Sequence, residues 1–317
     1  MLALKTETRE STRGEDFFVD VPADFRCESG DALPETQLRL RLYGDVRRPL
    51  VVVSGGISSG RCLHDWWGDQ VGDGAAIDLT RFCALGFDFS PTEDFRVRLS
   101  PRDQARLVAI ALDSLAVERV FAWVGASYGA MVGLAFAAEA PERLERLCAI
   151  SAAHKPAALA RGWRGVQRRV VEFAIAQGAA EEGLSLARQL AMITYRSAEE
   201  FDERFPGAVG ADGRSDLDRY LVARGDAYVS AMAPQRWLSL SEAIDRLDVD
   251  PASVRAEVTL AACPTDQIAP IELIQELSRR VPRLSALHEL PSLYGHDAFL
   301  KEPAQVAAII TSCLEGA

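Results

Sequence analysis

Ser127 stands in a sequence setting that suits nucleophilic catalysis. It is the centre of the run Gly125-Ala126-Ser127-Tyr128-Gly129, which has apolar segments on both sides. A Gly-x-Ser-x-Gly run between a strand and a helix forms a sharp turn that presents the serine hydroxyl above the end of a sheet. The Tyr128 amide would then lie free at a helix N-terminus, where it can bind an oxyanion. These residues predict acyl chemistry at Ser127.

A serine nucleophile needs a base, and the base needs an acid that orients it. After a turn of this type the chain order is serine, acid, histidine. Of the four histidines, His296 lies in a loop just beyond the last predicted strand, as that order requires. His64 precedes the serine and is the second candidate, whereas His154 directly follows a predicted strand and His288 lies within one. We therefore predict that His296 is the base.

Asp266 is the candidate acid. It lies in a loop that follows the predicted strand 258–262 and is broken by Pro264. Ligands of open α/β sheets bind at the carboxyl ends of strands, which is where this loop begins. Alternatively, Asp266 caps the helix that starts at Pro270, but its spacing from that helix is poor for a cap. A catalytic triad of Ser127, Asp266 and His296 is the better prediction.

The loop 54–60, Ser-Gly-Gly-Ile-Ser-Ser-Gly, is expected to supply a second oxyanion donor. It follows an apolar strand, and its glycines let the backbone approach the site closely. The amide of Ile57 is the candidate, beside that of Tyr128. A glycine-rich loop after a strand can also hold phosphate, but this one has neither a G-x-G-x-x-G nor a G-K-[ST] pattern.

Strands that alternate with helices predict a mostly parallel sheet covered by helices on both faces. With the Gly-x-Ser-x-Gly turn, this order of elements predicts the α/β-hydrolase fold. Residues 1–14 are polar and are expected to be a loose tail. Residues 15–155 and 251–317 would form the core, and residues 156–250, which carry few strand signals, a helical lid insertion. The expected core strands and helices are strands 17–21, 38–42, 50–53, 82–89, 120–124, 147–150, 258–262 and 287–290, and helices 100–115, 131–140, 270–280 and 303–314.

Composition narrows the function classes. The chain has 317 residues, 48% of them hydrophobic, and a net charge of −11, which disfavours nucleic acid or an anionic membrane as partner. No stretch is long and apolar enough for a transmembrane helix, and the first residues lack the apolar core of a signal peptide, so a cytoplasmic protein is expected. The six cysteines form no C-x-x-C pair and no cluster has ligand spacing, so we expect free thiols and no metal.

Several segments together resemble the homoserine O-acyltransferase family of methionine biosynthesis. The similarity spans roughly residues 50–300, with gaps. The most specific segments are a stretch on the predicted insertion and a loop around the candidate base. The segments that carry the resemblance are Asp65-Trp66-Trp67, Val71 to Asp78 with Arg81-Phe82, Ala187 to Ser197, Thr265-Asp266-Gln267 with Pro270, and Gly295 to Leu300.

The resemblance implies ping-pong transfer of an acyl group from acetyl-CoA, through acyl-Ser127, to L-homoserine, with no bound cofactor. It also implies that Arg188 and Tyr195 hold the carboxylate of homoserine, that Asp297 holds its amino group, and that the insertion forms a homodimer interface. An amino acid is a zwitterion, which a guanidinium and a carboxylate can fix at both ends. From the residues alone, Arg188 could instead pair with a glutamate on a solvated helix face, Glu181 or Glu199, and Tyr195 could be a core residue.

Two departures from the family pattern leave the substrates open. The run Gly129-Ala130-Met131 stands where Gly-Gly-Met is usual, and residues 89–100 form a much shorter connection than the resemblance implies. Succinyl-CoA is therefore an alternative donor, L-serine an alternative acceptor, and hydrolysis of esters or thioesters an alternative reaction. A non-catalytic role is disfavoured because all three triad positions are filled. A succinyl donor would need a cation near the acyl tail, for which Arg61 is one candidate.

Overall fold

Eight strands form one sheet in the order β1-β2-β6-β3-β7-β8-β9-β10 in the computed structural model of the chain, which describes residues 14–35 and 37–316. The pairs β1–β2 and β2–β6 are antiparallel, and all other neighbouring strands run parallel. The predicted tail lies, except for Gly14, outside the described residues. The strands are β1 (Glu15–Asp20), β2 (Gln37–Tyr43), β3 (Leu50–Ser54), β6 (Cys83–Phe87), β7 (Val120–Ala126), β8 (Leu144–Ile150), β9 (Glu257–Ala262) and β10 (Leu284–Glu289), with a separate short pair β4 (Val71–Gly72) and β5 (Ile77–Asp78).

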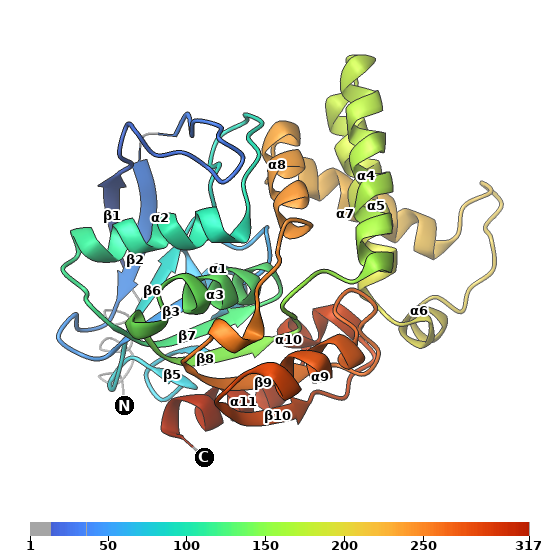
Figure 1. Cartoon of the computed structure of the whole chain (residues 1–317). Coiled ribbons are helices and arrows are strands. Elements are labelled where there is room, and N and C mark those ends of the chain that lie inside the picture. Colours follow the sequence, from blue (N-terminus) through green and yellow to red (C-terminus); the bar gives the residue numbers. More distant parts are fainter. Residues whose placement is uncertain (1–13, 36, 317) are drawn as a thin grey trace, which may run out of the picture.

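Helices cover both faces of the sheet (Figure 1). Each predicted core strand and helix is present, with ends that differ by up to three residues from the ranges expected. The helix predicted from Ser100 begins with a capping box, in which the Ser100 and Asp103 side chains each accept from the other's backbone amide. The core helices are α1 (Leu63–Trp67), α2 (Pro101–Ser114), α3 (Tyr128–Glu139), α9 (Ile271–Arg280), α10 (Ala298–Lys301) and α11 (Pro303–Glu315).

The central strands are buried on both faces because helices cover each of them. Along β3, Leu50 and Val52 belong to the apolar cluster shared with α2, α3 and α9, whereas Val51 and Val53 belong to the cluster shared with α1 and α11. This explains why the strand is apolar throughout rather than alternating. The α/β-hydrolase architecture predicted from the sequence is therefore confirmed.

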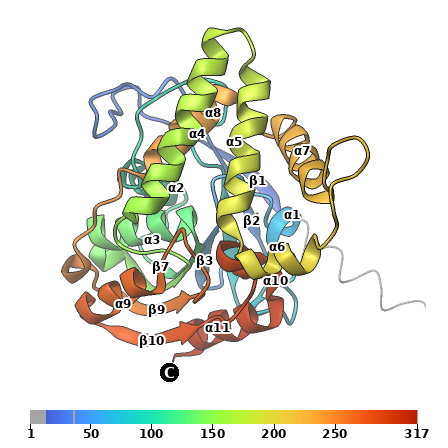
Figure 2. The same cartoon turned by 90° about the vertical axis from the view of Figure 1, so that its right-hand side faces the viewer.

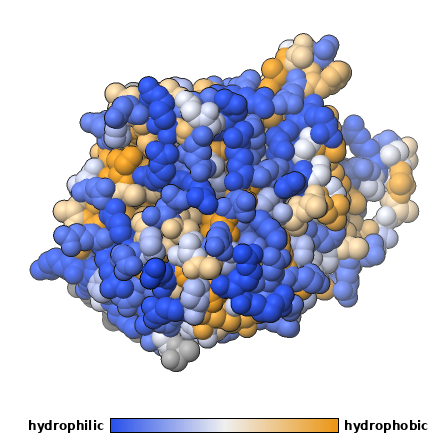
Figure 3. Space-filling view, viewed as in Figure 1, coloured by the Kyte–Doolittle hydropathy of each residue, from blue (hydrophilic) through white to orange (hydrophobic). Residues whose placement is uncertain are grey.

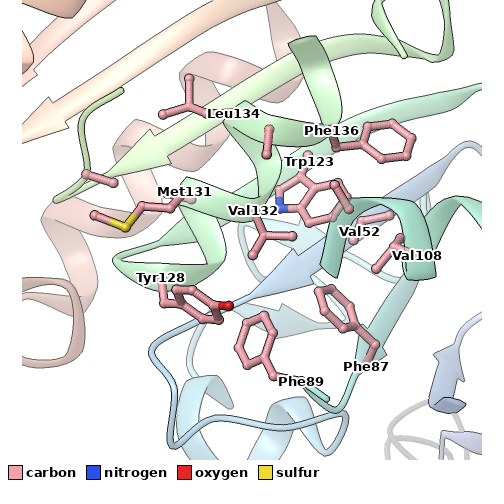
Figure 4. Packing of buried hydrophobic residues seen from close by; sticks show 14 of the residues in the cluster. Val52, Phe87, Phe89, Val108, Trp123, Tyr128, Met131, Val132, Leu134 and Phe136 are labelled. Carbon is pink, nitrogen blue, oxygen red and sulfur yellow. The ribbon is translucent and has the colours of Figure 1, made fainter. Parts of the chain in front are cut away.

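Trp123 on β7 anchors the core beneath the predicted nucleophile turn. Its side chain is fully buried and packs against the rings of Phe87 and Phe136 (Figure 4). Its indole N–H lies 2.9 Å from the Ser54 hydroxyl and 3.1 Å from the carbonyl oxygen of Gly129. The same residue therefore fills the core and ties the end of β3 to the start of α3.

Between β8 and β9 the chain forms five α-helices and no strand. These helices lie within residues 156–250, the predicted insertion. They are α4 (Ala158–Ala176), α5 (Ala180–Tyr195), α6 (Ala198–Arg204), α7 (Asp216–Val229) and α8 (Pro234–Ile244). Helices α4 and α5 form an antiparallel hairpin that projects beyond the sheet (Figures 1 and 2). The Arg164 guanidinium on α4 contacts the carboxylate of Asp245, directly after α8, at 2.7 Å, which ties the hairpin to the rest of the insertion.

The face in Figure 3 is largely hydrophilic, with apolar side chains scattered among the polar ones. No helix among residues 14–35 and 37–316 is long and apolar enough to cross a membrane.

Close packing around the turn gives a stability prediction. A Cβ on Gly129 would collide with the backbone of Ser54, whereas a Cβ on Gly162, on α4, would meet nothing within 4 Å. We expect Gly129→Ala to lower the free energy of unfolding by about 1–3 kcal/mol, the usual cost of overpacking. Gly162→Ala should instead raise it by up to about 1 kcal/mol, because alanine favours helix. Urea unfolding followed by circular dichroism measures both, and equal effects would contradict this account.

Candidate active site

Ser127 occupies a strained turn between β7 and α3. Its backbone has φ 51° and ψ −122°, a left-handed conformation that non-glycine residues rarely adopt. The turn closes only because its flanking residues are glycines: a Cβ on Gly125 would lie 2.7 Å from the backbone of Ala130. The amide of Gly129 donates to the carbonyl of Gly55 at 2.7 Å, which holds the turn against the loop after β3. The strain is sustained by this surrounding packing.

Ser127, His296 and Asp266 form one chain of hydrogen bonds. The Ser127 hydroxyl lies 2.7 Å from Nε2 of His296, and Nδ1 of His296 lies 2.7 Å from Oδ2 of Asp266. An ionised carboxylate can only accept, so Nδ1 carries the proton and Nε2 accepts from the hydroxyl. His296 belongs to the turn Gly295–Asp297 after β10, and Asp266 to the loop after β9. The three residues predicted from chain order thus meet at the carboxyl ends of three strands.

Asp266 holds its own loop as well as His296. Its Oδ1 accepts from the amides of Ile268 and Ala269, at 2.8 and 2.9 Å, while Oδ2 binds the imidazole. No side chain caps α9, whose N-cap is Pro270, so the alternative that Asp266 caps this helix is wrong; the amides that it accepts from belong to the loop before the helix. With one oxygen fixed by backbone, the other is held rigidly toward His296.

Charges around His296 favour its protonated form. Burial alone would lower the pKa of the imidazole, which is 5% exposed as a residue. The Asp266 carboxylate, through its charge and its hydrogen bond, outweighs that effect, and Asp297 adds to it. The guanidinium of Arg164 acts in the opposite direction. The pKa of His296 is raised above its ordinary value of 6.5 as a result.

The two residues whose amides are the candidate oxyanion donors come from separate segments. Ile57, on the loop after β3, and Tyr128, the first residue of α3, both line the cavity that contains Ser127. Neither amide donates a hydrogen bond to another described residue. The Ser58 hydroxyl, next to Ile57, is 3.0 Å from the Tyr228 hydroxyl on α7, so the insertion helps to hold this loop. Both amides are free to bind an oxyanion.

The cavity over Ser127 has a volume of about 190 Å³. Loops of the core and helices α4 and α5 of the insertion supply residues to its lining. All eight candidate site residues except Asp266 line this cavity, and Asp266 lies behind His296.

Arg188 and Tyr195 face the cavity from α5. The guanidinium of Arg188 lies 4.7 Å from the centre of the Tyr228 ring and 5.8 Å from that of Tyr195. It forms no ion pair with a described residue, so its predicted alternative, pairing with Glu181 or Glu199, is wrong. The aromatic rings fix Arg188 without neutralising it. Burial raises the pKa of Tyr195, so its hydroxyl stays protonated.

Asp297 is held by a second arginine. Its Oδ2 lies 3.2 Å from Nε of Arg196, and Nη1 of Arg196 lies 2.8 Å from Glu200. Arg196 is buried, so this network fixes the Asp297 carboxylate against the cavity. Arg196 directly follows Tyr195 in the chain but was not among the predicted site residues.

Other residues line the cavity without having been predicted, among them Trp163, Arg164 and Gln167 on α4. The predicted insertion gave no local pattern that separates Arg164 from the other arginines of that helix. Arg61, the candidate cation for a succinyl tail, pairs with Asp16 and Asp88 at 3.1 and 2.6 Å and does not line the cavity.

The other chemically interesting side chains lie elsewhere. His64, the second candidate base, places Nε2 3.1 Å from the Val71 carbonyl and does not line the cavity. All six cysteines are free thiols, and five of them are buried. Within the described ranges, no group of three or more His, Cys, Asp or Glu residues could hold a metal ion.

Comparison with known proteins places this geometry in a family. The model of the α/β hydrolase fold family matches residues 48–303. The homoserine O-succinyltransferase of Xanthomonas campestris pv. campestris is 38% identical over 292 residues, which cover 88% of this chain and 79% of that protein. The homoserine O-acetyltransferase of Deinococcus radiodurans is 30% identical, over 87% of this chain and 85% of that protein.

A solved structure shares the whole architecture. The homoserine O-acetyltransferase from Bacillus anthracis superposes with a TM-score of 0.85, over 95% of this chain and 97% of that one, at 14% identity. That likeness shows the fold, and the two sequence relatives show the branch within it. This chain therefore belongs to the homoserine O-acyltransferase family of the α/β-hydrolase fold.

Proposed function

We propose that the protein transfers an acyl group from acyl-CoA to the hydroxyl of L-homoserine, with Ser127 as nucleophile, His296 as general base and Asp266 as the orienting acid. The observation that carries this proposal is the hydrogen-bonded chain of the three residues, which opens into a cavity with an unpaired guanidinium on its wall. A hydrolase of simple esters has no need for that charge. An enzyme that accepts an amino acid does need it, because the guanidinium can bind the carboxylate of the amino acid.

In the first half-reaction, Nε2 of His296 takes the proton as Oγ of Ser127 attacks the thioester carbonyl carbon. The developing oxyanion is bound by the amides of Ile57 and Tyr128. When the C–S bond breaks, the imidazolium returns its proton to the departing thiolate. CoA leaves and an ester on Ser127 remains.

In the second half-reaction, His296 takes the proton of the homoserine hydroxyl as its oxygen attacks the ester carbon. The bond from that carbon to Oγ of Ser127 then breaks, and the imidazolium returns its proton to Oγ. Arg188, with Tyr195 beside it, binds the carboxylate of homoserine, and Asp297 binds its ammonium group. Oδ2 of Asp297 is occupied by Arg196, so Oδ1 is the oxygen available to the substrate. Two opposite charges at fixed positions orient the acceptor hydroxyl toward the acyl group.

The resemblance of the sequence favours acetyl-CoA as the donor, whereas the name of the Xanthomonas relative favours succinyl-CoA. The Deinococcus relative is named for acetyl transfer, so the two names leave both donors in consideration. L-serine, one carbon shorter than homoserine, is the alternative acceptor. No bound cofactor enters the proposed reaction.

The insertion, residues 156–250, acts in this proposal as a lid and as a homodimer interface. The lid role is supported by the cavity residues that α4 and α5 supply. The dimer role is supported by large apolar side chains that these two helices expose. They are Leu159, Val166, Phe173, Leu186 and Ile193. A cytoplasmic location would suit the acyl-CoA donor and the free thiols.

The main test is release of free CoA thiol from acetyl-CoA and from succinyl-CoA, each alone and with L-homoserine or L-serine. We expect steady release that depends on homoserine, and its loss by several orders of magnitude in Ser127→Ala. Steady release that no amino acid accelerates would instead identify a thioesterase and contradict the transferase.

Substrate binding gives a second prediction. Arg188→Gln should raise the KM for homoserine by about 30-fold, which corresponds to the loss of about 2 kcal/mol from a charged hydrogen-bonded pair. The rate of the first half-reaction, measured as a burst of thiol, should change far less. Arg169→Gln, on the exposed side of α4, is the matched control and should leave both unchanged. An unchanged KM in Arg188→Gln would remove Arg188 from the acceptor site.

The ionisation of His296 gives a third prediction. Because its folded-state pKa is raised, the neutral base is lost as the pH falls through a value above 6.5. Acyl transfer should therefore have an acid limb above pH 6.5. NMR titration of the imidazole ring protons should give the same pKa in the unaltered protein. In Asp266→Asn the pKa should be lower, because the carboxylate charge that raises it is gone. A pKa unaffected by that substitution would contradict the assignment of Asp266.

A further inference from the structure

Ser151 brings a buried hydroxyl to the active-site cavity without a protein partner. It lines the same cavity as Ser127 and His296 and is 1% exposed as a residue. Its Oγ forms no hydrogen bond with any described residue. A buried hydroxyl without a partner costs free energy, so most such groups in proteins are satisfied. The triad and the residues that hold the two charges of the acceptor leave this hydroxyl unused.

The backbone of Ser151 is strained as well. Its φ is 52°, in the left-handed region that glycine tolerates and other residues rarely adopt. The nucleophile Ser127, with φ 51°, has the same feature. Glycine at position 151 would relieve the strain and remove the hydroxyl that lacks a partner. Backbone geometry therefore gives no reason for a serine here, whereas a ligand of its hydroxyl would.

Ser151 is the first residue after β8, which lies between β7 and β9 in the sheet. The amide of Ser127, after β7, donates to the Ile150 carbonyl at 2.9 Å. The amide of Ser151 donates to the carbonyl of Ala261, on β9, also at 2.9 Å. Strand β9 leads to the loop that carries Asp266. Along the edge of the sheet, Ser151 therefore lies between the nucleophile and the acid.

The order of the strands separates the two sides of the nucleophile. Strand β3, whose loop carries Ile57, lies on one side of β7, and β8, β9 and β10 lie on the other. The carbonyl oxygen of the acyl group turns toward the candidate oxyanion donors. The atom that attacks or leaves turns toward the base, His296, which follows β10. Ser151 is on the side of the base, so its hydroxyl is placed to meet that atom.

The reacting hydroxyl is the polar group of homoserine that still lacks a residue to orient it. In the proposed function, Arg188 binds the carboxylate and Asp297 the ammonium group. The hydroxyl gives its proton to Nε2 of His296 and uses one lone pair to attack the acyl carbon. Its oxygen keeps a second lone pair, which can accept one hydrogen bond.

We propose that Ser151 binds the reacting hydroxyl of the amino-acid acceptor: Oγ–H donates to the acceptor oxygen and directs the other lone pair toward the acyl carbon on Ser127. This inference rests on the proposed function and adds a residue to its acceptor site. The proton of Ser151 stays on Oγ throughout, and the bonds that form and break are those of the second half-reaction. A site that hydrogen-bonds the hydroxyl selects acceptors that have one over analogues that lack it.

The experiment compares L-homoserine with L-2-aminobutyrate, which has the same carboxylate and ammonium group but no hydroxyl. In Ser151→Ala we expect kcat/KM for homoserine to fall about 10-fold, as for the loss of one hydrogen bond. The inhibition constant of L-2-aminobutyrate against homoserine should not change. The burst of thiol, which reports acylation of Ser127 before the acceptor reacts, should not change either.

Two further variants separate this role from a structural one. Ser151→Gly removes the same hydroxyl but relieves the strained φ, so it should lose the same activity while its urea unfolding midpoint rises. It keeps the test decisive if Ser151→Ala fails to fold. Ser278→Ala, on α9, removes a hydroxyl that donates to the Gln275 carbonyl and does not line the cavity. This matched control should leave both constants unchanged.

Each outcome decides the inference. An unchanged kcat/KM for homoserine in the Ser151 variants would overturn it. Equal weakening of homoserine and L-2-aminobutyrate would also overturn it and indicate a general change of the cavity. Loss of the burst would place the hydroxyl in the first half-reaction and overturn it too. Absence of homoserine-dependent thiol release from the unaltered protein would refute the proposed function, and the inference with it.

Discussion

The close approach of β3, β7 and α3 is the constraint on which the site depends. Gly125 and Gly129 allow the backbone to turn at Ser127 with a left-handed φ of 51°, and Trp123 hydrogen-bonds both sides of the turn from within the core. The serine hydroxyl is consequently fixed before any substrate binds. The Tyr128 amide is left without a partner by the same geometry, since it opens a helix directly at the turn. The proposed nucleophile and one proposed oxyanion donor are thus both positioned by one backbone conformation.

Charge is arranged around this turn in layers. Behind His296, the Asp266 carboxylate keeps one tautomer in place and raises the pKa of the imidazole. In front of it, Arg188 and Asp297 present opposite charges to the cavity, each held by neighbours that leave it available. On the neighbouring helix α4, Arg164 adds a second guanidinium to the cavity lining. In the proposed reaction the core supplies the reactive groups, and the insertion adds cationic side chains to the cavity.

Much of this arrangement could be predicted from the sequence because it follows from local rules. The turn motif identifies Ser127, and chain order then narrows four histidines to His296. The strand ends were harder to place, and β10 begins at Leu284 rather than at residue 287, where its apolar residues suggested.

The roles of arginines could not be derived in this way. Arg61 and Arg164 look alike in sequence, yet one is neutralised by two aspartates and the other faces the cavity. That difference is set by which carboxylates lie nearby in space, and no periodicity encodes it.

Mass spectrometry of the intact protein mixed with acyl-CoA in the absence of homoserine tests the central claim most directly. The account predicts that one acyl group is added, that it maps to the peptide containing Ser127, and that homoserine removes it faster than water does. An acyl group on any other residue, or no adduct while transfer to homoserine proceeds, would contradict the account.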